Sequence, residues 1–412
     1  MITDITQKEQ KLRTRSQLGI KPEKVTFGED TLSISDNMVK LDSYRQYWES
    51  MQDVRTRFRN NVDFLRGRQL ESYVTNDAGE TVKESEYISE QGKTPFVQNI
   101  IAPVLKSIEG LFRQDMGQSI VVSRKPDSAA IEKQMTNALQ SVLSANEAKE
   151  IDPRTLDYFL LSGIPAQRIG FDYISELRRY DVVIDYIDPN YVFFNNDIQD
   201  IRGKDLRIIG QLHDLVMDDL LVNFATNKKD KNFLQSMYLD DKYRMPDYNN
   251  MTRARVANLD FYVSTETFKC RVIEAWEKIA VDVIEIHDEM DGSEDIWDDT
   301  LDSLHVMANA RYEQYRAAAI PEEEIPRIHY KYTMVYKWFY KFMTPWGHIL
   351  REGESPYKGS IHPYVIAPYP LISGEVYGLV ETLLDIQKQF NRLFTLMDFI
   401  LNLNKKDEYK NL

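Results

Sequence analysis

The sequence predicts an α+β protein whose helix-rich and strand-rich segments follow one another along the chain. Apolar residues recur at helical spacing through much of the first 163 residues. β-Branched and aromatic runs, typical of strands, follow at 166–174, 180–189, 268–288 and 329–353. A last helical segment then begins near residue 375, so strands and helices do not alternate as they would in an α/β fold.

Composition sets the outer limits on function. The chain has 412 residues, a formal net charge of -14 and 28% charged residues, and its length suggests about two or three domains. Its Lys and Arg residues are interspersed with acidic residues. Sequence-independent binding to nucleic acid depends on clustered positive charge, so this pattern disfavours it.

Cysteine content and hydropathy limit the compartment. The single cysteine, Cys270, cannot form an intramolecular disulfide, which suits a reducing compartment. Residues 1–17 lack the apolar core of a signal peptide. The most apolar long segment, 376–402, contains charges that a bilayer would not tolerate, so no membrane span is predicted.

The first elements are helical. Residues 1–40 are polar and are expected to form a mostly irregular arm. Gly67 and Gly163 are expected to end helices, Asn99 to cap one, and Pro153 to occupy a first turn. Helical spacing of apolar residues predicts four helices, at 41–67, 99–118, 129–150 and 153–163.

Strands dominate the second half. The runs at 166–174 and 180–189 are separated by a polar turn, which predicts a hairpin. A charged helical insert, 298–319, lies between two later strand-rich blocks. The remaining predictions are helices at 212–225 and 229–239, a loop at 242–258, and strands at 268–288 and 329–353.

Common catalytic and metal-binding motifs are incomplete. The GKT at 92–94 lacks the earlier glycine of a phosphate-binding loop, because position 87 is Tyr. The acidic run 287–299 departs from a calcium loop at its first and last ligand positions, so a solvated hairpin tip is expected. Asp185 and Asp188 favour a structural turn over paired metal ligands. No catalytic residue, metal site or cofactor is predicted.

An aromatic run at 336–346 is the first candidate functional feature. Trp338 and Tyr340 share one face of the predicted strand, and Phe339 lies on the other. A strand apolar on both faces suits contact with partner subunits, with plain core packing as the alternative. The candidate docking residues are Trp338, Phe339, Tyr340 and Trp346.

The segment after Ser373 is the second candidate feature. Its apolar residues spread over more than one stripe of a helix, which predicts packing on several sides. Gly374 and Gly378 would permit close approach at the helix start. Three polar residues, Gln387, Asn391 and Arg392, interrupt its middle.

The order of several short motifs resembles the portal proteins of tailed bacteriophages, most closely those of short-tailed and crAss-like phages. The early motifs are Arg57-Phe58 followed by Gly67 and Gln69, and then Asn99, Gly110, Arg113 and Pro126. The middle is marked by Asp188, Pro189 and Asp197. The late motifs comprise Pro356, Tyr357, Pro370, Gly374, Gly378, Asp385, Gln387 and Asn391.

The resemblance implies a portal-type fold that assembles as a dodecameric ring at one capsid vertex. Its expected parts are an N-terminal arm (1–40), a helical wing (41–258), a stem or connecting segment (259–267), a β-rich clip (268–352) with the helical insert 298–319, a clip-to-stem connection (353–374) and a stem helix (375–412). In such portals the chain continues beyond the stem, so this sequence is expected to be the N-terminal part of a longer protein or a reduced ring.

The same resemblance implies the partners. The clip, with its helical insert, would dock the terminase large subunit and later the head–tail adaptor and tail proteins; the ring would meet the major capsid protein. Double-stranded DNA would pass through without tight binding. Gly374, Gly378, Gln387, Asn391 and Arg392 would serve stem packing or line a wet channel. The expected location is the virion, after assembly in the host cytoplasm.

Two other functions remain open on the sequence alone. One is an acidic structural adaptor of some other assembly. The other is a metal-dependent nuclease that uses carboxylates whose pairing the sequence does not reveal.

Overall fold

The structure of the protein is a computed structural model. It describes residues 31–123, 129–174, 179–239, 259–264, 266, 268–290, 292–297, 300–318, 321, 325–357, 359–372 and 374–410. The described residues form two compact units, a larger one drawn from 31–273, 344–348 and 363–410 and a smaller one drawn from 274–343 and 349–362. Helices and strands both contribute substantially, which confirms the α+β class.

The chain enters the larger unit through two helices, α2 (Thr31–Ser50) and α3 (Gln52–Leu65). Leu41, Tyr44 and Trp48 form the buried side of α2 at helical spacing. The helix predicted from residue 41 therefore exists, but it begins ten residues earlier and breaks at Met51. The expectation of an irregular arm is wrong for 31–40, and residues 1–30 lie outside the described residues.

A small hairpin follows where the sequence indicates a turn. Strands β1 (Tyr73–Thr75) and β2 (Thr81–Lys83) pair antiparallel and lead into α4 (Glu84–Glu90). The amide of Gly79 donates to the carbonyl oxygen of Asn76, which closes the turn. The strands on either side of this turn were not predicted.

Three more helices build the body of the larger unit: α5 (Ile101–Asp115), α6 (Ala129–Ala145) and α7 (Ala148–Ser162). The N-cap position of α5 is Ile100, one residue after the predicted Asn99, but Asn99 Oδ1 still accepts a hydrogen bond from the Ala102 amide at 3.1 Å in the first turn. Pro153 lies inside α7 and not in its first turn, because that helix begins five residues earlier. Gly163, with φ of 77°, ends α7 as expected.

A three-stranded sheet has the order β11-β3-β4. Strands β3 (Ala166–Ile174) and β4 (Arg179–Tyr186) form the predicted hairpin, and β11 (Tyr364–Ile366) pairs with β3. The outer edge of β4 is covered by a side chain: Asn146 donates to the Val182 carbonyl and accepts from the Ile184 amide, both at 2.9 Å. A single amide group thus replaces a neighbouring strand.

Farther along, β5 (Val192–Phe194) pairs with β6 (Ile208–Leu215), and α8 (Met217–Phe224), α9 (Lys228–Leu239) and α11 (Leu259–Tyr262) follow. The helix predicted at 212–225 is wrong for its first four residues, which belong to β6. Asp214 on that strand forms a buried, two-bonded ion pair with Arg271, at 2.7 and 3.1 Å. The loop predicted at 242–258 lies outside the described residues.

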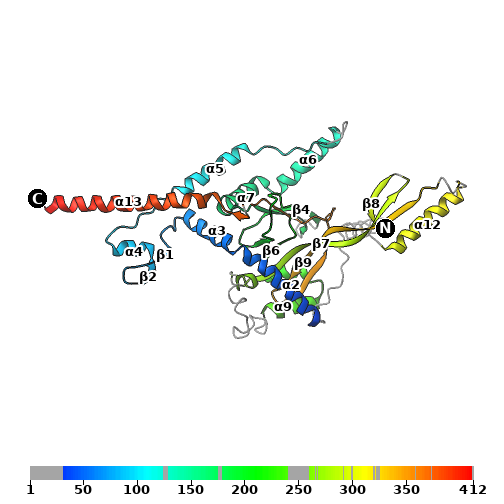
Figure 1. Cartoon of the computed structure of the whole chain (residues 1–412), viewed down its shortest axis with the longest axis horizontal. Coiled ribbons are helices and arrows are strands. Elements are labelled where there is room, and N and C mark those ends of the chain that lie inside the picture. Colours follow the sequence, from blue (N-terminus) through cyan, green and yellow to red (C-terminus); the bar gives the residue numbers. More distant parts are fainter. Residues whose placement is uncertain are drawn as a thin grey trace. The chain divides into compact units, whose positions relative to one another are not determined.

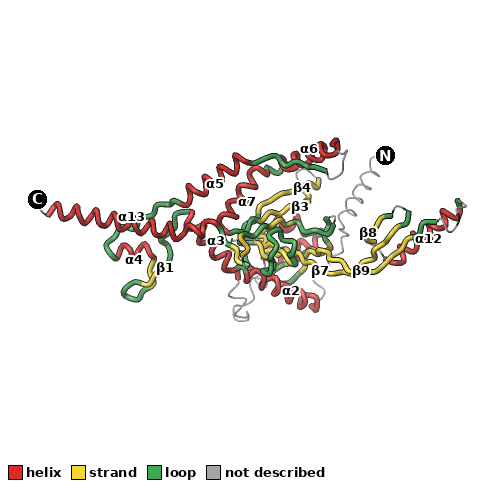
Figure 2. The backbone as a smooth tube through the Cα atoms, turned by 45° about the horizontal axis from the view of Figure 1, so that its top comes forward, coloured by secondary structure: helices red, strands yellow, loops and turns green. Residues whose placement is uncertain are grey.

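Long strands and one helix make up the smaller unit. Strand β7 (Cys270–Asp288) enters it at Glu274, and the unit continues through β8 (Ser293–Trp297), α12 (Leu301–Ala317), β9 (Ile328–Met343) and β10 (Ile349–Glu354). Both predicted strand blocks and the helical insert are confirmed. The sheet order places β9 between β7 and β10. Figure 2 shows the long strands β7 and β9.

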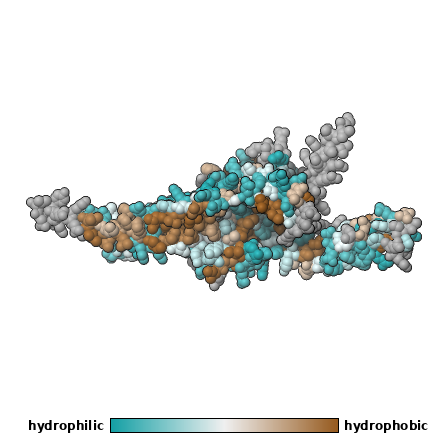
Figure 3. Space-filling model, turned by 90° about the horizontal axis from the view of Figure 1, so that it is seen from above, coloured by the Kyte–Doolittle hydropathy of each residue, from teal (hydrophilic) through white to brown (hydrophobic). Residues whose placement is uncertain are grey.

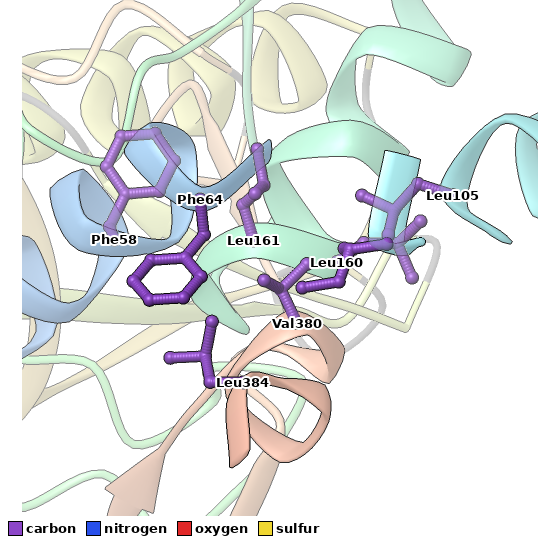
Figure 4. Close-up of a cluster of buried hydrophobic side chains, with 8 residues drawn as sticks. Phe58, Phe64, Leu105, Leu160, Leu161, Val380 and Leu384 are labelled. Carbon is purple, nitrogen blue, oxygen red and sulfur yellow. The ribbon is translucent and has the colours of Figure 1, made fainter. Parts of the chain in front are cut away.

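The chain returns to the larger unit through the short hairpin of β12 (Pro370–Ile372) and β13 (Glu375–Val376) and continues into α13 (Leu379–Lys410), the long helix that runs to the C-terminal end in Figure 1. Val380 and Leu384 of α13 pack against Leu160 and Leu161 of α7 and Phe64 of α3 (Figure 4). This apolar cluster fixes the first turns of α13 on the helical body.

Candidate functional site

Helix α13 changes character along its buried face. Val380 and Leu384 are apolar, but the next buried positions on the same face are Gln387, Asn391 and Thr395. Gln387 follows Leu384 by three residues, and the later members follow at intervals of four, which keeps all of them on one side of the helix. Buried polar groups require hydrogen-bond partners, and here the partner is the backbone of residues 96–100, which lie just before α5 and outside any helix or strand. We call Gln387, Asn391 and Thr395 the polar ladder.

The polar ladder binds the backbone of that segment at every second residue. Gln387 uses both ends of its amide, since Oε1 accepts from the Ile100 amide at 2.9 Å and Nε2 donates to the Gln98 carbonyl at 2.7 Å. Asn391 Oδ1 accepts from the Gln98 amide and Thr395 Oγ1 accepts from the Phe96 amide, each at 3.3 Å.

The match has a simple geometric cause. Four residues of a helix rise by about 6 Å, which is within the roughly 6.5 Å that two residues of a chain can span, so every fourth helix residue can meet every second residue of the segment. The rungs are also joined laterally: Gln387 Nε2 lies 2.9 Å from Asn391 Oδ1, and Asn391 Nδ2 donates to Gln69 Oε1 at 2.6 Å. Side chains of α13 thus form the hydrogen bonds to this segment that a neighbouring strand would form in a sheet.

This geometry corrects two of the predicted channel residues. Gln387 and Asn391 are 0% and 2% exposed, and their amide groups are used inside their own unit. They are therefore unavailable to a channel or to a neighbouring copy. Arg392, by contrast, is exposed, as that expectation requires.

The two predicted close-approach glycines behave differently. A Cβ on Gly378 would lie 2.4 Å from the Leu161 carbonyl carbon and 2.5 Å from the Leu160 oxygen, so the expected close approach is confirmed there. Gly374 has open space around it and a φ of 81°. Its conformation, and not its small size, is what the hairpin turn before α13 requires. Ser373 lies outside the described residues.

The outward side of α13 is apolar and uncharged. Hydrophobic residues follow the helix along its length in Figure 3, and several are about half exposed, including Ile386 at 58% and Leu393 at 59%. The charge-free face of α13 consists of eight exposed residues: Leu379, Thr382, Ile386, Gln389, Leu393, Leu396, Met397 and Ile400. One side of α13 thus packs against its own chain, as the prediction of packing on several sides requires, whereas another apolar side is open to solvent.

The predicted docking residues of the smaller unit are mostly covered. Trp338 and Tyr340 are each 6% exposed. Trp338 packs on His362 with ring centroids 4.5 Å apart, and Tyr340 packs on Trp276 at 5.2 Å. Phe339 is half-buried. Trp338 and Tyr340 thus form core contacts in their own unit, which corrects the expectation that they are available to a partner.

Trp346 lies in the larger unit. It is half-buried, and its ring packs edge-on against Tyr238, with centroids 5.1 Å apart. The four predicted docking residues are therefore divided between two units and do not form one surface patch within either.

An exposed row on β9 was missed. Tyr332, Met334 and Tyr336 are 66–68% exposed and alternate along the strand on the face that also carries Trp338. Tyr330, 43% exposed, continues the row. We call Tyr330, Tyr332, Met334 and Tyr336 the β9 row. Their alternation is visible in the sequence, but whether each residue is covered is not.

No catalytic or metal-binding arrangement emerges from the parts of the chain that the structure describes. Within them no group of three or more His, Cys, Asp or Glu side chains is placed to hold a metal ion. A cavity of about 320 Å³ is lined in part by Glu150, Arg154 and Asp185. Asp188 accepts from the amide and side chain of Asn190 in a turn, as the structural interpretation requires. Burial raises the pKa of the Asp188 carboxyl, and those hydrogen bonds oppose that shift.

Comparison with known proteins gives a family. The sequence model of the phage P22-like portal protein family matches residues 41–409. No curated protein matches the chain significantly. Among the described residues, no helix combines the length and apolar character needed to cross a bilayer.

Proposed function

The chain belongs to the phage P22-like portal protein family, and from this we propose that it forms a ring at a unique capsid vertex, through which the viral genome is packaged and later ejected. The family match carries the proposal because it spans 41–409 of a 412-residue chain. Portal proteins are structural proteins of the virion and not enzymes. The role of this chain is accordingly one of assembly and passage.

The proposed ring contains about twelve copies, with α13 as the stem helix that borders the channel. A half-exposed apolar face more than twenty residues long is unfavourable in water and is typical of a surface covered by a partner. Another side of α13 carries the half-buried Glu381 and the exposed Asp385, Lys388 and Arg392, so its acidic and basic charges balance. That charged side is the one we assign to water in the channel.

The acidic composition suits passage of DNA. A net charge of -14 per copy opposes adhesion of a phosphate backbone, because affinity for phosphates depends on Lys and Arg. A ring structure whose channel lining is mainly basic would contradict this part of the proposal.

We assign partner docking to the smaller unit, as the clip that meets the terminase large subunit and later the adaptor and tail proteins. The β9 row provides exposed aromatic and methionine side chains, the kind enriched at protein interfaces. The charged helix α12 is the second docking element. Deleting 298–319 should leave ring assembly intact and weaken terminase or adaptor binding in a pull-down with the purified partner; loss of the ring instead would assign α12 a structural role.

The first test is the mass and symmetry of the purified protein, by light scattering and negative-stain averaging. A closed ring of about a dozen copies with a central hole is expected. A stable dimer with metal-dependent cleavage of DNA would refute the proposal and favour the nuclease alternative. A small closed oligomer without a channel would favour an adaptor.

A further inference from the structure

A second uncharged surface lies on α5. The charge-free face of α5 comprises six residues, all exposed: Pro103, Val104, Ser107, Gly110, Leu111 and Gln114. Charged residues make up 28% of the chain and are usually concentrated on the surface. An exposed helix face that runs for three turns without a charged residue is therefore unusual, and depletion of charge is typical of interface cores.

The charge-free face of α13, defined above, is the longer counterpart in the same unit. Two other sides of α13 are either buried or charged. One is occupied by the polar ladder and the apolar cluster, and another carries Glu381, Asp385, Lys388 and Arg392. The charge-free face, all of whose side chains are described, is therefore the side that we consider for an apolar partner.

We propose that the charge-free face of α13 in one copy packs against the charge-free face of α5 in the next copy. This inference rests on the proposed ring. Copies related by a rotation that closes a ring contact one another through two different surfaces, unlike the two halves of a twofold dimer. Direct α13–α13 packing around a ring would place the apolar face of one helix against the charged or occupied side of its neighbour. The face on α5 is free of that conflict.

The side chains suit helix packing. Gly110 and Ser107 leave a shallow surface on α5, flanked by Val104 and by Leu111, which is 62% exposed. The larger Ile386 and Leu393 side chains of α13 can fit over such a surface at ordinary helix separations of about 8–10 Å. Contact would remove apolar groups on both helices from water without burying an unpaired charge.

Cysteine crosslinking of the full-length ring tests the pairing. A variant with Leu111→Cys and Leu393→Cys is assembled, its mass is measured, and it is treated with a short bismaleimide. Each copy can then link to both neighbours, so denaturing gels should show a ladder that ascends to the full ring. The pair Val104→Cys and Ile386→Cys repeats the test at a second level. Native Cys270 is buried, and the unmodified protein serves to measure its background.

The matched control moves one cysteine to the charged side of the same helix, as Leu111→Cys with Lys388→Cys. This control should give no series of crosslinked species on the gel. The inference is overturned if rings form but neither tested pair yields species beyond the dimer, or if Leu393→Cys alone crosslinks as efficiently as the double variant. An unmodified protein that forms no ring overturns the proposed function, and the inference with it. The mass measured before crosslinking distinguishes that outcome from the others.

Discussion

Replacing Gln387 with alanine tests the polar ladder most directly, because α13 supplies its own control. Gln389 is the same residue type two positions away on the same helix, but it is exposed. Helix propensity therefore changes equally in Gln387→Ala and Gln389→Ala. Any difference in the free energy of unfolding reports the buried hydrogen bonds.

The magnitude follows from the groups left behind. Gln387→Ala removes the partner of the Ile100 amide and one partner of the Gln98 carbonyl. A buried backbone group without a partner costs about 1–3 kcal/mol. Both groups are only partly buried, so we expect a total loss of about 2–3 kcal/mol, near the lower end of that range for each. Gln389→Ala should stay within about 0.5 kcal/mol of the unmodified protein.

Urea unfolding followed by circular dichroism, at a concentration where the subunits are unassembled, measures this difference. An independent measurement is hydrogen exchange of a peptide that covers 96–100, which should exchange faster in Gln387→Ala only. Equal stability of the two variants, together with unchanged exchange at 96–100, would show that the ladder does not hold the segment.

Three further predictions concern the larger unit. Gly378→Ala should lower the free energy of unfolding by more than about 3 kcal/mol in urea unfolding, because the added Cβ would overlap the α7 backbone. Gly374→Ala has space for the Cβ but a strained backbone, so it should cost about 1–2 kcal/mol. Similar losses in the two variants would contradict the different roles given to these glycines. Asp214→Asn should cost about 3–5 kcal/mol because it leaves a buried guanidinium without its counterion, and Asp200→Asn, in an exposed ion pair, should leave the urea midpoint nearly unchanged. Burial lowers the pKa of His348, so the unfolded chain takes up that proton first; the free energy of unfolding should fall as pH drops below about 6.5, and a His348→Phe variant with an equally steep fall would refute this.

Most helices and strands could be predicted from apolar spacing and from the glycines that end them. The start of α2 could not. Residues 31–40 show no regular apolar stripe, and part of their support comes from distant packing: Met38 lies so close to Gly347 that a Cβ there would be 2.9 Å from its sulfur. Contacts between residues about 300 positions apart have no local signature.

The polar ladder was hidden for a different reason. Gln387 and Asn391 stood out as polar residues in an apolar helix, and both a wet channel and a buried network were compatible with that pattern. Their partner segment, 96–100, is bound through its backbone amides and carbonyls. Every residue other than proline carries the same backbone groups, so the sequence of that segment does not show that it is bound.

Strand β9 shows the limit of predicting burial from the alternation of side chains along a strand. Tyr336 and Trp338 are adjacent members of one strand face, and the sequence alone does not distinguish them. The two residues differ in what covers them. The Trp338 amide donates to Ser360 Oγ at 2.7 Å and its carbonyl accepts from the Ser355 amide at 2.8 Å, so a later segment of the chain lies beside Trp338. The covered part of the strand is therefore decided by residues about twenty positions downstream.

The polar ladder also sets a time order for synthesis. Ile100 and Gln387 are 287 residues apart, so the segment 96–100 leaves the ribosome long before its partners exist. At translation rates of roughly 5–20 residues per second, its amides remain bonded to water for about 15–60 seconds. The first turns of α13 also complete the apolar cluster with α3 and α7, so Phe64 and Leu160 likewise wait for Val380 to be synthesised. The larger unit can therefore close only after synthesis has reached α13, and a nascent chain stalled before residue 380 would present these sites to chaperones.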